Sequence, residues 1–289
     1  MGLNKEAIKI GFAYVGIVVG AGFSTGQEVM QFFTPFGLWS YIGVIISGFI
    51  LGFIGRQVAK IGTAFEAKNH ESTLQYVFGK KFSKVFDYIL VFFLFGIAVT
   101  MIAGSGSTFE QSFGIPTWLG ALIMTVLIYL TLLLDFNKIV RALGIITPFL
   151  IIMVILIAVF YLFTGSISLG EVNSAMPETS AWKGIFWGLV YGGLAFAVGF
   201  STIVAIGGDA SKRRVSGAGA MFGGVLYAIL LALINFSLQT EYSKIKDVAI
   251  PTLNLAKGIH PWLGLVLTVI MLAVMYNTIL GLCYSFAAR

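Results

Sequence analysis

The chain has 289 residues, of which 58% are hydrophobic and 10% are charged, and its mean hydropathy is +0.96. Soluble domains average about 45–50% apolar and about 25% charged residues, so this composition excludes a soluble enzyme and a soluble nucleic-acid-binding protein. The net charge of +6 is therefore read as a topology signal rather than as a sign of a nucleic-acid partner. The single cysteine, Cys283, lies in an apolar run and indicates neither a disulfide nor a metal site.

The apolar runs predict an all-α fold. A membrane-spanning helix needs about 20 predominantly apolar residues, and lipid excludes open sheets because unpaired backbone groups are too costly there. We predict a polytopic membrane protein whose residues 1–289 form a single transmembrane domain. Residues 72–86 and 251–258 are expected to form short helices outside the spans. Eight spans are expected, at residues 7–34, 36–56, 84–113, 117–134, 138–164, 183–206, 213–239 and 261–286.

The basic residues predict the orientation of these spans. If the N-terminus is cytoplasmic, four of the 18 Lys and Arg residues fall on the outer side, namely Lys183, Lys244, Lys246 and Lys257. The other basic residues fall on the cytoplasmic side, as the positive-inside rule describes. We therefore expect a multi-pass protein of the cytoplasmic membrane with a cytoplasmic N-terminus.

A short motif suggests an internal repeat. Gly22-Phe23-Ser24-Thr25 in the first span recurs as Gly199-Phe200-Ser201-Thr202 in the sixth, and the same shift places the second span on the seventh. A repeat of five helices has an odd number of crossings, so its second copy is inverted, as in many secondary transporters. Residues 1–164 would form the first repeat and residues 183–289 a partial second repeat of three helices, lacking the last two spans of a ten-span plan. A genuine eight-span protein is the alternative.

Two spans contain residues that disfavour a continuous helix. The run from Gly20 to Glu28 holds three glycines, a serine and a threonine, and the spacing of Thr25 and Glu28 is that of a capping box at a restarting helix. The sixth span has a similar weakness around Gly192 and Gly199. We predict breaks in helices 1 and 6 that form a substrate site. The alternative is that these glycines serve close helix packing.

Several polar residues are candidates for function. Glu28 at membrane depth can pair with a substrate ammonium, carry a proton, or satisfy the start of a half-helix. Asn277 and Thr278 in the eighth span can supply oxygens to a cation or form hydrogen bonds between helices. Asp87 is expected to form an ion pair with basic residues at the interface, and His70 to lie in a loop.

The run GAGFSTGQEVMQFF, from Gly20 to Phe33, resembles the first-span motif of YkvI-type bacterial membrane proteins. These proteins are placed in the amino acid–polyamine–organocation superfamily, which has the LeuT-type fold. The resemblance extends over the chain in span order and loop lengths. It implies a ten-span carrier in which spans 1, 3, 6 and 8 surround a central site.

The resemblance also implies site residues. Coupling would use Na⁺ between Gly20 and the Asn277-Thr278 pair, or H⁺ with Arg141 or Lys138 as the basic side chain of the fifth span. Sodium-coupled members usually have an adjacent Ser/Thr pair in this span, and this sequence has Asn277-Thr278 in its place. The substrate-binding candidates are Ala21, Gly22, Phe23, Ser24, Thr25, Gly26 and Glu28 in the first span, Ser105 in the third, and Phe196, Gly199, Phe200 and Ser201 in the sixth.

The sequence therefore predicts a secondary active transporter of amino acids or related small amines, ion-coupled and working by alternating access. The alternative is a membrane receptor or sensor that keeps the transporter fold and binds a small ligand without transporting it. No enzymatic activity, cofactor or metal site is expected, apart from Na⁺ or H⁺ as the coupling ion. The expected partners are a small-molecule substrate and the lipid bilayer.

Overall fold

The structure is a computed structural model that describes residues 5–133, 146–168 and 170–287, and every regular element in these ranges is helical. The N-terminal part contains α1 (Lys5–Val18), α2 (Ala21–Thr25), α3 (Gln27–Phe32), η1 (Thr34–Trp39), α4 (Ser40–Phe49), η2 (Ile50–Ile54), α5 (Gly55–Phe65), α6 (Glu71–Phe113) and α7 (Thr117–Leu132). The C-terminal part contains α9 (Ile146–Thr164), α10 (Val172–Ala175), α11 (Ala181–Gly208), α12 (Arg213–Thr240), α13 (Tyr242–Ile245), α14 (Pro251–Ile259) and α15 (Pro261–Ala287). The prediction of an all-helical chain is confirmed for these residues.

Five helical stretches in the described residues are long and apolar enough to cross a membrane: Thr34–Phe65, which joins η1 to α5, then α6, α11, α12, and Pro261–Cys283 of α15. The shorter apolar helices α7 and Pro148–Thr164 add to them. Large apolar side chains on the outer surface, such as Ile45 (70% exposed) and Phe163 (81% exposed), suit contact with lipid. The start of the predicted fifth span, residues 138–145, lies outside the described residues. The division into two repeats stays a prediction.

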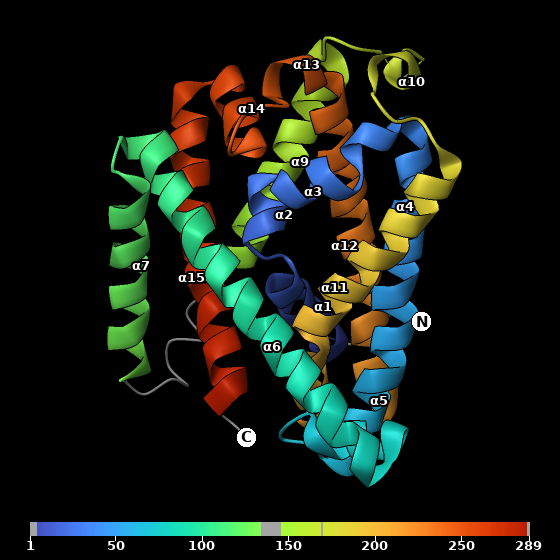
Figure 1. The fold of residues 1–289 in the computed structure, drawn as a ribbon. Coiled ribbons are helices and arrows are strands. Elements are labelled where there is room, and N and C mark those ends of the chain that lie inside the picture. Colours follow the sequence, from blue (N-terminus) through green and yellow to red (C-terminus); the bar gives the residue numbers. More distant parts are fainter. Residues whose placement is uncertain (1–4, 134–145, 169, 288–289) are drawn as a thin grey trace.

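The predicted break in the first helix is confirmed. Helix α1 ends at Val18, and the chain then forms two separate short helices, α2 and α3, which lie in the upper half of the molecule in Figure 1. Gly26 joins them with φ +81° and ψ −3°, a left-handed conformation that glycine adopts without steric cost. The break thus lies in the middle of the predicted first span, residues 7–34.

The capping box predicted at this break is wrong. Gly26, not Thr25, is the residue that precedes α3, so Glu28 is one position closer to the helix start than a capping box requires. The Thr25 hydroxyl instead accepts a hydrogen bond from the Gln27 N–H at 3.4 Å and donates one to the Gly22 carbonyl at 3.2 Å. The Glu28 carboxylate is left for another partner.

The predicted break in the sixth span is also wrong, because α11 is one continuous helix from Ala181 to Gly208. Its glycines allow close contact with neighbouring helices. A Cβ atom on Gly199 would lie 2.9 Å from the Tyr14 ring of α1, and one on Gly192 would lie 3.0 Å from the Ser47 Cα of α4. The packing alternative therefore explains these residues.

The connecting segments differ in detail from the prediction. Residues 72–86 are helical, but α6 bends sharply at Gly79 (φ +73°, ψ +165°), so the second part of this segment continues directly into the third span. The predicted short helix at residues 251–258 is present as α14. It packs against α15 and the broken first helix near the top of Figure 1.

Candidate functional site

Helices α6 and α14 both contact the break in the first helix. Met101 of α6 packs so closely on Gly20 that a Cβ atom there would lie 2.3 Å from its terminal methyl carbon. Thr252 of α14 donates a hydrogen bond to the Ser24 carbonyl at 2.5 Å and contacts Gly26. Glycines at positions 20 and 26 therefore allow the neighbouring helices to reach the backbone of the break.

Glu28 projects from α3 and is bonded to the first of two linked, buried tyrosines. The Tyr191 hydroxyl of α11 donates a hydrogen bond to Glu28 Oε2 at 3.1 Å. Tyr227 of α12 lies 2.5 Å from the Tyr191 hydroxyl, and it donates because the single Tyr191 proton is directed to Glu28. Both tyrosines are 1% exposed. The three groups form a hydrogen-bonded chain from α12 through α11 to the carboxylate.

The backbone of α2 lies directly beneath this carboxylate. A Cβ atom on Gly22 would lie 2.0 Å from Glu28 Oε1 and 2.2 Å from its Cγ. Only glycine at position 22 leaves room for Glu28 in this position. The glycine-rich run thus both breaks the helix and accommodates the acidic side chain.

A cavity of about 540 Å³ opens beside Glu28, between the broken helix, α6 and α11. This volume is within the range of about 300–1,000 Å³ that is usual for small-molecule sites. The lining combines one carboxylate, hydroxyl and amide groups, and aromatic rings. It consists of Gly22, Thr25, Gln27, Glu28, Gln31, Phe32, Phe92, Phe93, Gly96, Ile97, Thr100, Met101, Gly104 and Leu194.

The structure brings only part of the predicted substrate set to this cavity. Gly22, Thr25 and Glu28 line it, whereas Phe23 is fully buried with its ring 5.4 Å from that of Tyr227. Ser24 is buried and contributes its carbonyl to Thr252, Gly26 forms the turn, and Ala21 begins α2.

The residues predicted in spans 3 and 6 lie elsewhere. Phe196 and Phe200 line an adjoining apolar groove of about 600 Å³ between α6 and α11, which shares Phe32, Phe93 and Leu194 with the Glu28 cavity. Gly199 packs on α1. Ser105 is fully buried and donates to the Ile102 carbonyl at 2.7 Å. Because α11 does not unwind, its motif has no free backbone groups to offer at the cavity.

Ser201 belongs to a buried polar cluster that the sequence did not reveal. Its hydroxyl lies 2.9 Å from His70 Nδ1, and His70 Nε2 lies 2.9 Å from Asp87 Oδ1. A carboxylate only accepts, so the His70 Nε2–H donates to Asp87, and Nδ1 on the other side of the ring is the atom that faces the Ser201 hydroxyl. His70 lies in the connection between α5 and α6, as predicted, but its side chain is only 5% exposed. The cluster ties the start of α6 to α11.

The ion-coupling candidates are partly brought together. The γ-methyl of Thr278 lies 4.0 Å from the position of a Cβ atom on Gly20, so α15 reaches the break as the resemblance implied. The Thr278 hydroxyl donates to the Val274 carbonyl at 3.0 Å, which leaves its lone pairs to accept. Asn277 is partly buried on the same helix. Arg141 lies outside the described residues.

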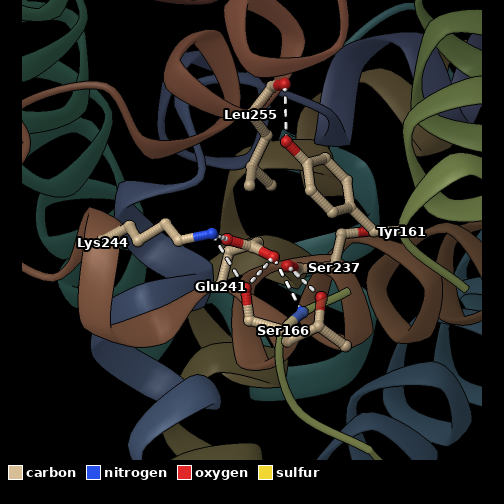
Figure 2. Close-up of polar contacts among 7 residues, drawn as sticks. Tyr161, Ser166, Ser237, Glu241, Lys244 and Leu255 are labelled. Atoms are coloured by element: carbon tan, nitrogen blue, oxygen red, sulfur yellow. Dashed lines mark hydrogen bonds and ion pairs between the residues drawn. The ribbon is translucent and has the colours of Figure 1, made fainter. Parts of the chain in front are cut away.

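A second polar cluster fastens the helices on the predicted outer side (Figure 2). Glu241, at the end of α12, accepts hydrogen bonds from the Ser166 N–H at 2.9 Å and the Ser166 hydroxyl at 2.7 Å, and forms an ion pair with Lys244 at 2.6 Å. Tyr161 of α9 donates to the Leu255 carbonyl of α14 at 3.0 Å. These contacts join α9, α12 and α14, the last of which covers the break.

Two buried amides in α12 were also missed. Asn235 Nδ2 donates to the Ser40 hydroxyl at 2.8 Å, and Gln239 Nε2 donates to the Gly37 carbonyl at 2.8 Å. Both amide residues are fully buried, and they stabilise the turn at Gly37, where φ is +60°. Two amides one helical turn apart in an apolar span are the signal that could have found them.

Comparison with known proteins identifies two proteins of similar sequence and a solved structure with a similar fold. No protein-family model matches the chain. It is 26% identical over 284 residues to the uncharacterized membrane protein YkvI of Bacillus subtilis. This alignment covers 97% of the present chain and 80% of YkvI. It is 28% identical over 149 residues to the uncharacterized protein YyaD of the same organism. That alignment covers 52% of the present chain and 43% of YyaD.

Among solved structures, the chain superposes on the Eremococcus coleocola manganese transporter with a TM-score of 0.54 and 15% identity. The match covers 98% of this chain and 66% of the transporter, so the chain spans just under two thirds of that protein's length. The chain is therefore a multi-pass membrane protein that is homologous to YkvI and shares the helical fold of a transporter.

Proposed function

We propose that the protein is a secondary active transporter of amino acids or related small amines, ion-coupled and working by alternating access. The observation that carries this proposal is the Glu28 carboxylate, held by Tyr191 beside a cavity at the break in the first helix. Discontinuous helices of this kind form the substrate sites of many secondary transporters. An ionisable residue within a span is costly to place there, which favours a functional role.

The chemistry of the cavity favours an organic ammonium group as the ligand. One carboxylate neutralises one monocation, whereas a divalent ion bound to the same carboxylate would retain a net positive charge. The lining also presents Phe32, Phe92 and Phe93, and aromatic faces attract ammonium groups by cation–π interaction. For this reason we infer an amine-bearing substrate, although the fold is shared with a manganese transporter.

The same region contains candidate residues for binding the coupling ion. Thr278 next to Gly20 supports a sodium site between α15 and the break, and Glu28 supports coupling to a proton. Arg141 is retained as the basic alternative for proton coupling. We infer the cytoplasmic membrane and a cytoplasmic N-terminus from the distribution of basic residues.

Uptake into proteoliposomes tests this function. The purified chain is reconstituted and supplied with radiolabelled amino acids and amines under a sodium gradient, a pH gradient, or neither. We expect saturable uptake driven by one gradient and its loss in Glu28→Gln, which keeps the shape of the side chain and removes its charge. Glu110→Gln is the matched control, because Glu110 bonds Thr117 at the far end of α6 and does not line the cavity.

Normal uptake kinetics in Glu28→Gln would refute the site. A different result would favour the sensor: a ligand that raises the melting temperature in a Glu28-dependent manner, without any accumulation in the liposomes. Ligand binding to the folded state stabilises a protein by about 2.7 kcal/mol at a hundredfold excess over Kd, so the binding measurement is sensitive enough to separate the two functions.

A further inference from the structure

A second, larger cavity lies between α5 and the N-terminal half of α12, and it shares no lining residue with the Glu28 cavity. Its volume is about 1050 Å³. By the predicted topology it lies on the cytoplasmic side. Its lining consists of Arg56, Gln57, Lys60, Ile61, Ala64, Phe65, Tyr76, Arg213, Arg214, Gly217, Ala218, Met221, Phe222 and Val225.

One end of this cavity is strongly basic. Arg56 and Lys60 come from α5, Arg213 and Arg214 come from the first turn of α12, and the lining contains no carboxylate. The side chains of Arg56 and Lys60 are partly buried and lie across Gly217. A Cβ atom at position 217 would be 3.2 Å from Arg56 Cγ and 3.0 Å from Lys60 Cε. The two cations are thus held at the cavity by close packing of their stems.

The other end is apolar. Met221, Phe222 and Val225 follow Arg213 along α12, and Val225 lies about 18 Å from Arg213 at a rise of 1.5 Å per residue. Val225 is 49% exposed. From the basic end to the apolar end, the cavity follows the order of groups in a phospholipid, from the phosphate to the acyl chain.

We propose that this cavity binds an anionic phospholipid of the adjoining leaflet. The four basic side chains contact the headgroup phosphate, and one acyl chain runs along Met221, Phe222 and Val225. Basic pockets between membrane-spanning helices recognise anionic headgroups in this way. A free phosphate would satisfy the cations but would leave the apolar half of the cavity without a ligand, so the lipid is favoured by both parts of the lining.

Thermal unfolding of the full chain in detergent tests the proposal. The protein is titrated with phosphatidylglycerol, with phosphatidylcholine, and separately with inorganic phosphate and glycerol 3-phosphate. We expect phosphatidylglycerol to raise the melting temperature, and the effect to weaken at high salt because screening reduces attraction between charges near the surface. Arg56→Gln/Lys60→Gln is expected to weaken the apparent affinity about 25-fold, from about 1 kcal/mol per basic side chain near an anionic headgroup.

Two control variants separate this site from general charge effects. Lys80→Gln/Lys81→Gln removes the same charge from exposed positions of α6 outside the cavity and is expected to leave the affinity unchanged. Arg56→Lys/Lys60→Arg keeps the charge and is expected to retain binding. Equal effects of the two lipids, equal losses in both Gln double variants, or a shift produced by phosphate alone would each overturn the proposal.

Discussion

Replacement of Gly22 by alanine tests the link between the broken helix and the acidic side chain. The new Cβ atom would lie 2.0 Å from Glu28 Oε1 and 2.1 Å from its Cδ, so the carboxylate must leave its position. The backbone of α2 need not change, because the clash is with the end of a flexible side chain. We therefore expect Gly22→Ala to fold and to displace Glu28 from the Tyr191 hydroxyl.

The size of the effect follows from the contacts that are lost. A hydrogen bond to a charged group contributes about 1.5–3 kcal/mol, and alanine in place of glycine gains roughly 1 kcal/mol in a helix. The free energy of unfolding should thus fall by only about 0.5–2 kcal/mol. If the ligand's ammonium group loses a contact of similar strength, its affinity should fall about 10- to 150-fold.

The assay is ligand binding to purified variants, measured by calorimetry with the substrate that uptake identifies. Gly96→Ala is the matched control, because Gly96 lines the same cavity from α6 and a Cβ atom there meets nothing within 4 Å. Unchanged affinity in Gly22→Ala would refute the reasoning. So would an equal loss in both variants, since that outcome would show that the added methyl acts through the volume of the cavity.

Three further predictions concern the surroundings of the site. Tyr227→Phe removes the donor to Tyr191 and should weaken binding by a few-fold with little change in melting temperature, which the same calorimetry detects. Thr252→Val removes the hydrogen bond to the Ser24 carbonyl and should lower the free energy of unfolding by about 1–3 kcal/mol, measured by denaturant titration. Burial alone would raise the pKa of the Glu241 carboxyl, but hydrogen bonds from Lys244 and Ser166 outweigh it and hold this pKa below its ordinary value. The stability from Glu241 is therefore present above the unfolded-state pKa of about 4.3 and is lost as the pH falls through the lowered folded-state pKa, so Glu241→Gln should flatten the melting temperature over that acid range.

The break in the first helix could be predicted because its causes are local. Gly20, Gly22 and Gly26 lie within seven residues, and glycine weakens a helix wherever it stands. The left-handed turn at Gly26 and the close approach of Met101 to Gly20 both depend on the absence of a side chain. Local propensity and tertiary contact agree at this place, so the sequence pattern was sufficient.

The sixth span shows where the same reasoning fails. The motif Gly-Phe-Ser-Thr lies in a short separate helix at residues 22–25 and within an unbroken helix at residues 199–202. The first copy is preceded by Gly20 and followed by Gly26, whereas the second lies between Val198 and Ile203. The flanking residues, and the tyrosine of α1 that packs on Gly199, decide the conformation, and the four shared residues do not.

The partners of Glu28 and Ser201 could not be predicted from one sequence. Tyr191 and Tyr227 are two of 11 tyrosines, and nothing in their local sequence shows that their hydroxyls meet. His70 lies beyond the last turn of α5, and its contact with Ser201 depends on how α6 bends at Gly79 against α11. Such pairings arise from the way the helices pack. A hydropathy pattern predicts the number and length of the helices but not which of their side chains meet.

Under the proposed alternating access, different contacts oppose opening on the two sides of the cavity. On the predicted outer side, α14 covers the break through Thr252 and the Ser24 carbonyl. On the predicted cytoplasmic side, His70 and Ser201 hold the start of α6 against α11. Glu28 lies between these contacts and belongs to neither. A substrate that attracts Glu28 away from Tyr191 would alter the junction of α3 with α11 first, so the carboxylate is placed where ligand binding can bias the equilibrium between the two openings.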